Sequence, residues 1–282
     1  MLRIIMDSAG DIPNEWLEKY DIQVIPINIH FGEKTYFQGI DLTNNGFYQL
    51  VKKTGIIPKT SQPTPKQFEI FYRKNASPGE TILSVHVTSK LSGTYASAEI
   101  AAAELKNEFN IYPVDSGGGS ASMGFMCKEA RELDREGKGI REILDRLIYI
   151  RHHTEIILTL DNLEYARMSG RVKALQAALA SLLNVKPIVV LNDGILNVTE
   201  KVRTRGRSLE RILEKMRERI GNMRVNIAVV HAQDPLIGDK LLERVKETFN
   251  YKELIFTELS TGIAANLGPG TVGIIAYPAL EG

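Results

Sequence analysis

The sequence lacks the features that mark secreted, membrane-spanning and nucleic-acid-binding proteins. A single cysteine, Cys127, excludes a disulfide within the chain, and its apolar surroundings predict a buried, inert thiol. The formal net charge of +1 gives no global attraction for nucleic acid or an anionic membrane. No apolar run reaches the roughly 18 residues of a membrane span, and the N-terminus has no signal-peptide core. We expect a cytoplasmic protein that binds no nucleic acid and has no stable membrane insertion.

Recognised catalytic and cofactor signatures are missing as well. The sequence contains no HExxH, CxxC, GxSxG, Walker A or dinucleotide GxGxxG motif. His152 and His153 are adjacent, so on a helix they would point about 100° apart and make a poor metal pair. Asp7 and Asp115 each end a predicted strand and could hold a metal, although helix capping is the commoner role for such residues. We expect no metal, no cofactor and no chemistry performed by this chain alone.

The order of apolar and amphipathic segments predicts an α/β protein of two domains. Before residue 150, short apolar runs alternate with amphipathic ones, which is typical of a parallel sheet with crossover helices. Strands are expected at 2–6, 22–31, 81–87 and 111–114, with helices after Pro13, after Thr64 and at 94–107. Later, runs at 187–191 and 195–199 flank Asn192-Asp193-Gly194, which indicates an antiparallel hairpin. We expect an N-terminal α/β/α parallel-sheet domain over 1–155 and a C-terminal two-layer mixed-sheet domain over 156–282.

Two hydroxyl-rich segments, 59–64 and 88–97, each precede a predicted helix of the first domain. In a parallel sheet, ligands bind at the carboxyl ends of the strands, where such segments can converge. Ser92 is placed to cap the helix that follows it, and Gly93 would let a ligand approach the backbone. Capping and turn formation alone could also explain these hydroxyls. If the two segments converge, neutral hydroxyls and backbone N–H groups suit a carboxylate or phosphate held without a full counter-charge.

Basic residues cluster between 201 and 211, and Arg171 lies in a second basic stretch. The first cluster contains Lys201, Arg203, Arg205, Arg207 and Arg211. A solvated face is the plain interpretation of such a run. The alternative is a positive patch for a partner that presents acidic groups or phosphates.

Seven motifs follow one another in an order typical of one family. They are Asp7-Ser8-Ala9-Gly10-Asp11, Lys59-Thr60-Ser61-Gln62-Pro63, Ser89-Lys90-Leu91-Ser92-Gly93-Thr94-Tyr95, Val114-Asp115-Ser116, Ser169-Gly170-Arg171-Val172, Lys186-Pro187 with Asp193-Gly194, and Gly268-Pro269-Gly270-Thr271-Val272-Gly273. On these residues the chain resembles the DegV-like fatty-acid-binding proteins over essentially its whole length.

The resemblance implies that the protein holds one long-chain fatty acid of the palmitate, stearate or oleate type. The tail would be buried and the carboxyl group would lie near the domain boundary. Thr60 or Ser61, with Ser92, falls where the family hydrogen-bonds the carboxylate, and Gly93 and Thr94 adjoin them. Family members often have histidine two residues before the Gly-Pro-Gly motif, where this chain has Asn266. Asparagine donates and accepts hydrogen bonds but does not become a cation near neutral pH.

The resemblance also implies a partner. The fatty acid would be presented to a separate ATP-dependent fatty-acid kinase, which makes an acyl phosphate for phospholipid synthesis. Arg171, Arg203 and Arg205 then become candidates for contacting the kinase or its nucleotide phosphates. Two alternatives stay open at this point: a hydrolase or transferase that uses Ser92 as nucleophile, and a binder of a phosphorylated small molecule.

Overall fold

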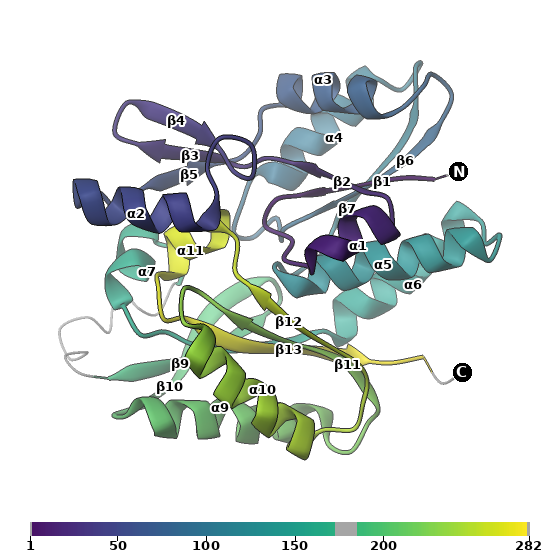
Figure 1. The fold of residues 1–282 in the computed structure, drawn as a ribbon. Helices are drawn as coiled ribbons and strands as arrows, with labels where there is room; N and C mark the ends of the chain where they lie inside the picture. Colours follow the sequence, from purple (N-terminus) through teal and green to yellow (C-terminus); the bar gives the residue numbers. More distant parts are fainter. Residues whose placement is uncertain (1, 173–184, 281–282) are drawn as a thin grey trace. The chain divides into compact units, whose positions relative to one another are not determined.

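The computed structural model describes residues 2–172 and 185–280, which form two compact units (Figure 1). The first unit runs to His152 and also includes Ser260–Gly262. The second unit runs from His153 to Leu259 and resumes at Ile263. The chain thus returns to the first unit for three residues near its end, a feature that a continuous division after residue 155 does not contain.

A four-stranded parallel sheet forms the centre of the first unit, with the strand order β2-β1-β6-β7. Its strands are β1 (Arg3–Asp7), β2 (Ile22–Ile25), β6 (Thr81–His86) and β7 (Asn110–Asp115). Parallel neighbours need crossover connections, and helices supply them here. The parallel sheet predicted from the alternating segments is confirmed.

Helices pack on this sheet from both sides (Figure 1). On one face, α3 (Pro65–Asn75) and α4 (Thr94–Glu104) share a buried hydrophobic cluster with Ile5 of β1. On the other side, α5 (Ala121–Arg135) contacts β1 and β6. The remaining helices of this unit are α1 (Asn14–Lys19), α2 (Asn44–Thr54) and α6 (Ile140–His153).

The start of α3 follows directly from local sequence. The Thr64 hydroxyl accepts a hydrogen bond from Gln67 N at 3.2 Å, and Gln67 Oε1 accepts one from Thr64 N at 2.8 Å. Pro65 occupies the first helical position, where its missing N–H would have no intrahelical partner. This capping box ends the 59–64 segment at a defined point.

A second, antiparallel sheet replaces part of one predicted strand. The expected strand over 22–31 is wrong, because the chain leaves the parallel sheet at Pro26, which has no N–H for a strand ladder. Ser8 stabilises the chain on both sides of Pro26, since Ser8 N donates to Ile25 O and Ser8 Oγ accepts from Ile27 N. The chain then forms the order β4-β3-β5 from β3 (Asn28–Phe31), β4 (Lys34–Phe37) and β5 (Lys59–Ser61).

The second unit contains a six-stranded mixed sheet in the order β10-β9-β8-β13-β11-β12. Its strands are β8 (Glu155–Thr159), β9 (Lys186–Asn192), β10 (Ile195–Val202), β11 (Val225–His231), β12 (Tyr251–Glu258) and β13 (Val272–Pro278). Only the β11–β12 pair is parallel among the paired strands. The β9–β10 hairpin turns at Asp193 and Gly194, both at positive φ, as the sequence predicts.

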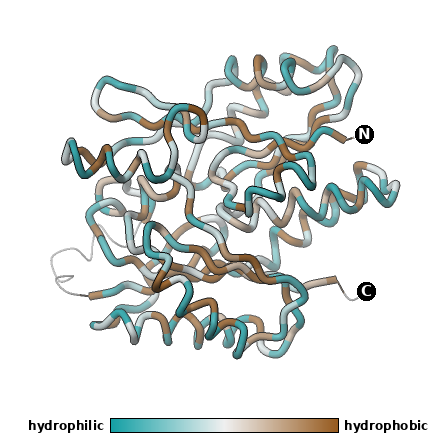
Figure 2. The backbone as a smooth tube through the Cα atoms, in the orientation of Figure 1, coloured by the Kyte–Doolittle hydropathy of each residue, from teal (hydrophilic) through white to brown (hydrophobic). Residues whose placement is uncertain are grey.

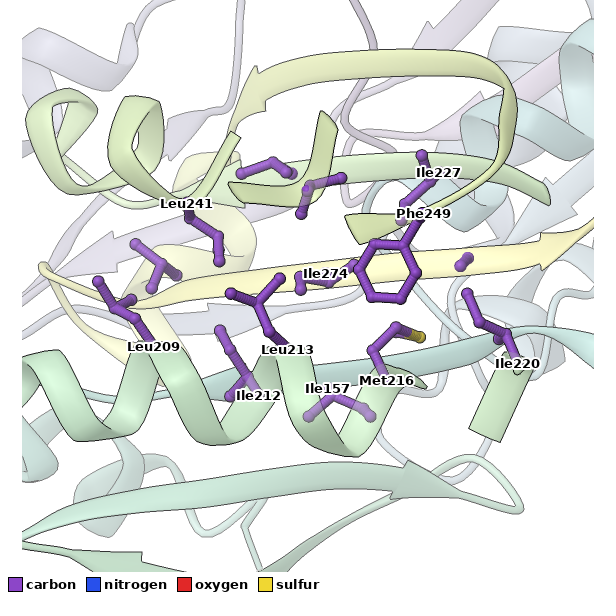
Figure 3. Close-up of a cluster of buried hydrophobic side chains, with 14 of the residues drawn as sticks. Ile157, Leu209, Ile212, Leu213, Met216, Ile220, Ile227, Leu241, Phe249 and Ile274 are labelled. Atoms are coloured by element: carbon purple, nitrogen blue, oxygen red, sulfur yellow. The ribbon is translucent and has the colours of Figure 1, made fainter. Parts of the chain in front are cut away.

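Two long helices, α9 (Arg205–Ile220) and α10 (Pro235–Thr248), cover one face of this sheet. Leu213 and Met216 of α9 point at Ile274 and Ile157 on the strands (Figure 3). Hydropathy follows the same division, since the central strands are continuously apolar while α9 and α10 alternate (Figure 2). The predicted two-layer mixed-sheet class is confirmed for this unit. The short helix α7 (Leu163–Ser169) belongs to this unit, and the short helix α11 (Thr261–Leu267) begins in the first unit and ends in the second. No helix among the described residues is long and apolar enough to cross a membrane.

Candidate ligand-binding site

The two hydroxyl-rich segments meet in the first unit. A methyl group placed on Gly93 would come within 2.9 Å of the Gln62 side-chain nitrogen, so the segments touch at these two residues. Glycine at 93 leaves room for the exposed Gln62 side chain, which would have to shift if residue 93 carried a side chain. The two segments therefore converge next to the end of β5, although β5 belongs to the antiparallel sheet and only 88–97 follows a strand of the parallel one.

Neither Ser92 nor Thr94 is the N-cap of α4. The N-cap is Gly93, and the cap position makes no side-chain hydrogen bond. Ser92 Oγ lies 2.8 Å from Thr94 Oγ1 and accepts a weaker bond from Thr94 N at 3.3 Å. The expectation that Ser92 caps the helix is wrong by one residue, because the chain enters the helix at Gly93 rather than at Ser92. Thr94 is fully buried and Ser92 is half-buried, so these hydroxyls form a pair at the helix start.

Thr60 and Ser61 face opposite sides of the β3–β5 pair, because successive strand residues alternate. Thr60 lies opposite Ile29, which is fully buried, and Ser61 lies opposite Asn28. Asn28 Nδ2 donates to Ser61 Oγ at 3.3 Å and to Gln62 O at 3.1 Å. The Thr60 hydroxyl is therefore on the apolar face and the Ser61 hydroxyl on the polar one.

His30 contacts one of the predicted ligand hydroxyls, which sequence reasoning missed. Its Nε2 lies 2.8 Å from Ser61 Oγ, and its Nδ1 lies 2.9 Å from Thr35 Oγ1. Its partner is 31 residues away and comes from a sheet that was not predicted, so no local pattern could have identified the contact.

The two strand-ending aspartates hydrogen-bond backbone groups rather than forming a metal site. Asp7 Oδ1 accepts from Ala9 N and Asp7 Oδ2 from Val87 N, both at 2.9 Å. Asp115 Oδ1 accepts from Gly117 N at 2.9 Å. Within the part of the chain that the structure describes, no group of three or more His, Cys, Asp or Glu side chains is arranged to hold a metal ion.

A serine, a histidine and an aspartate form a hydrogen-bonded chain, but the serine is Ser84 rather than Ser92. Ser84 Oγ lies 2.8 Å from His86 Nε2, and His86 Nδ1 lies 3.2 Å from Asp7 Oδ2. All three side chains are 0 % exposed. The buried Tyr72 hydroxyl also donates a hydrogen bond to Ser84 Oγ. No ester could reach Ser84 without unfolding the sheet around it. This network joins β1 to β6 and is not a hydrolytic centre.

In the second unit, the predicted motifs share hydrogen bonds around Ser169 and Asn266. Ser169 Oγ donates to Asn266 O at 3.1 Å, and Arg171 Nη1 donates to Ser169 O at 2.5 Å. Gly268 and Gly270 both have positive φ, and any side chain there would collide with Tyr165 or Asp161. The Gly-Pro-Gly turn thus packs against the start of α7, with the half-buried Asn266 immediately before it.

The basic residues of 201–211 differ in their exposure and in whether they already form ion pairs. Arg207 and Arg211 are paired with glutamates, Arg211 with Glu200 at 2.5 Å among others. Arg205 is mostly buried, donates to Gly270 O and lies 3.6 Å from Asp234 Oδ2; burial lowers the pKa of its guanidinium. Arg203 is exposed and forms no hydrogen bond or ion pair with any residue the structure describes.

Comparison with known proteins agrees with the fold and the motifs. The family model described as "Uncharacterised protein, DegV family" matches residues 1–279. The chain belongs to the DegV family. The resemblance stated from the seven motifs is therefore confirmed. The protein DegV of Bacillus subtilis is 30% identical over 275 residues, which cover 97% of this chain and 98% of that protein.

Solved structures of DegV family members match the whole chain. A family member from Thermus thermophilus, described by its fatty-acid binding, has a TM-score of 0.89 at 29% identity and covers 99% of both chains. The Bacillus subtilis DegV structure, described as a fatty-acid-binding protein, has a TM-score of 0.86 at 29% identity, again over 99% of both chains.

Proposed function

We propose that this protein binds one long-chain fatty acid and holds its carboxylate with Thr60 and Ser92. The observation that carries the proposal is the meeting of the two hydroxyl-rich segments at Gly93 and Gln62. Fatty-acid binding by the similar Thermus thermophilus and Bacillus subtilis proteins supports this ligand class.

The chemistry of the segments suits a carboxylate at the end of an apolar chain. An ionised carboxylate only accepts hydrogen bonds, and hydroxyl groups can donate to it without a full counter-charge. Thr60 is favoured over Ser61, because Thr60 shares its face with the apolar Ile29. A hydroxyl at the edge of apolar side chains matches the junction between head group and acyl tail.

The chain itself would not perform chemistry on the ligand. Ser92 is paired with Thr94 rather than with a general base, which speaks against an acyl-enzyme mechanism. The bound fatty acid would instead be presented to a separate ATP-dependent kinase. One carboxylate oxygen attacks the γ-phosphorus, the bond to the ADP oxygen breaks, and acyl phosphate and ADP form.

Arg171, Arg203 and Arg205 are the proposed contacts with that kinase or its nucleotide phosphates. Arg203 is the strongest of the three, since it is exposed and has no partner among the described residues. Replacing Arg203 with alanine should leave fatty-acid binding intact and lower acyl-phosphate formation in the presence of the kinase. Arg224→Ala, at another exposed arginine of the same unit, is the control. Equal loss of binding and of phosphorylation in the Arg203 variant would argue against a separate partner surface.

The carboxylate role is tested by oleate titration of delipidated protein. Thr60→Val and Ser92→Ala each remove one hydroxyl, and a hydrogen bond to a charged group is worth about 1.5–3 kcal/mol. Affinity should therefore fall by roughly tenfold to a hundredfold. Thr54→Val is the matched control, because the Thr54 hydroxyl donates to Leu50 O of its own helix and accepts from Ile56 N just after it. Unchanged affinity in both Thr60→Val and Ser92→Ala would refute the assignment of the head group to these segments.

A further inference from the structure

The segment that carries Ser92 begins as a tight turn immediately after β6. Leu91 N and Ser92 N both donate to Thr88 O, at 3.1 and 3.2 Å. Lys90 N donates to the Thr88 hydroxyl at 3.3 Å. These bonds make residues 88–92 a rigid turn. A displacement of Thr88 or Ser89 would therefore also displace Ser92.

Two aspartates from the neighbouring strands hold the beginning of this turn. Strand β6 lies between β1 and β7 in the sheet, and the last residues of those strands are Asp7 and Asp115. Asp7 accepts from Val87 N, one residue before the turn. Asp115 accepts from Ser89 twice, from the hydroxyl at 2.7 Å and from the backbone N–H at 3.3 Å. Two bonds to one carboxylate fix both the position and the orientation of Ser89.

The position of Asp115 is in turn fixed by an arginine of α6. Arg151 of α6 donates to Asp115 O at 3.0 Å and lies 3.4 Å from Asp115 Oδ2. Gly117, at φ +65°, accommodates the Arg151 side chain, since a methyl group there would come within 2.9 Å of Arg151 Cγ. Asp115 is 8 % exposed, so its interactions with Ser89 are only weakly screened by water.

We propose that Asp115, acting through Ser89, is a positioning residue that sets the place of Ser92 and Thr94 for the ligand carboxylate. The inference rests on the proposed function for its ligand and on the hydrogen bonds above for its mechanism. A binding constellation needs its groups held to within about 0.5 Å, and among the residues that the structure describes Ser92 is supported by the turn and by Thr94. Ser89 is the informative position, because its side chain is exposed and can be changed without opening a cavity.

The test compares oleate affinity and backbone hydrogen exchange in Ser89→Ala, Ser89→Thr and Asp115→Asn. Ser89→Ala should lower oleate affinity by about fivefold to tenfold, the effect of one hydrogen bond. Ser89→Thr keeps the hydroxyl and should bind within about twofold of the parent protein, which is the rescue that a merely structural role would not give. Asp115→Asn should weaken binding at least as much as Ser89→Ala. In the ligand-free protein, the amides of 90–93 should exchange faster in Ser89→Ala and Asp115→Asn.

Glu129→Gln is the matched control. Glu129 is paired with Arg146 of the same helix as Arg151, at 2.6 Å and with similar burial. It should lower thermal stability without changing oleate affinity or exchange at 90–93.

Ser92→Ala separates failure of this proposal from failure of the proposed function. If Ser92→Ala weakens binding and Ser89→Ala does not, the positioning role is overturned while the fatty-acid site stands. If neither variant changes oleate affinity, Ser92 is not a contact of the carboxylate and the positioning role fails with it, while Thr60→Val decides whether the rest of the head-group assignment stands. Unchanged exchange at 90–93 in Asp115→Asn would overturn the positioning role whatever the ligand.

Discussion

Asp11 should make the first unit less stable as the pH rises toward neutrality. Its side chain is 4 % exposed; Ser120 Oγ donates to Oδ2 at 2.5 Å and Ser260 N donates to Oδ1 at 2.9 Å. Burial raises the pKa of this carboxyl to about 7, and the hydrogen bonds from Ser120 and Ser260 offset only part of that rise. The folded protein therefore keeps a proton on Asp11 at pH values where the unfolded chain has lost it.

The magnitude follows from the difference between the two states. The pKa rises by about three units from the ordinary value of 3.8, and each unit corresponds to about 1.4 kcal/mol. Because the folded state binds the proton more tightly, its contribution is fully present below pH 4 and is lost as the pH rises through 7. The unfolding free energy attributable to Asp11 should fall by roughly 4 kcal/mol across this range.

Asp11→Asn removes the titration while keeping the hydrogen bonds. The amide oxygen can accept from Ser260 N, and the amide nitrogen can donate to the Ser120 hydroxyl. The variant should therefore gain stability relative to the parent protein with rising pH, by about 1.4 kcal/mol per unit between pH 4.5 and 6.5.

The assay is urea unfolding at a series of pH values, followed by the fluorescence of Trp16. This is the only tryptophan, and it is buried in the unit that contains Asp11. Glu80→Gln is a control of opposite sign, because the hydrogen bond from Arg3 lowers the pKa of Glu80, so the stability that this carboxylate contributes is lost as the pH falls rather than as it rises. A difference between the parent protein and Asp11→Asn that does not vary with pH would refute the reasoning.

Three further predictions follow from packing, burial and capping. Gly124→Ala should destabilise the first unit by about 1–3 kcal/mol, because the new methyl group would overlap Ile12 Cγ2, and an unchanged melting temperature would contradict this packing. Cys127 should not react with a thiol reagent until the protein is denatured, since burial raises the pKa of its thiol; prompt modification of the native protein would show that the site opens. Thr64→Ala should cost about 1 kcal/mol in thermal or urea unfolding, through loss of the capping box with Gln67, and an effect below a few tenths would mean that the box contributes little.

Local signals predicted the elements whose causes are themselves local. The helix start at Thr64-Pro65 and the hairpin turn at Asp193-Gly194 depend on side chains and φ preferences within a few residues. The α/β class follows in the same way from alternating apolar runs. The strand over 22–31 failed because its apolar and β-branched residues suited one long strand, while the lack of an N–H on Pro26 decided the outcome.

The parts of the site that could not be predicted depend on contacts between distant segments. His30 reaches Ser61 only because β3 and β5 pair, and Asp11 holds Ser260, which is 249 residues away in the sequence. Composition and periodicity contain no information on such pairings. The convergence of the 59–64 and 88–97 segments was expected for a reason that holds for only one of them: 88–97 follows the parallel strand β6, whereas 59–61 forms β5 of the antiparallel sheet, which the sequence did not predict.

The central claim is that this chain carries a fatty acid, and native mass spectrometry of the purified protein tests it most directly. The account predicts one long-chain fatty acid per chain, released on denaturation, or stoichiometric uptake of added oleate or palmitate by delipidated protein. Protein that contains no acyl chain and takes up neither fatty acid would contradict the account, and a bound species that lacks an acyl tail would identify a different ligand class.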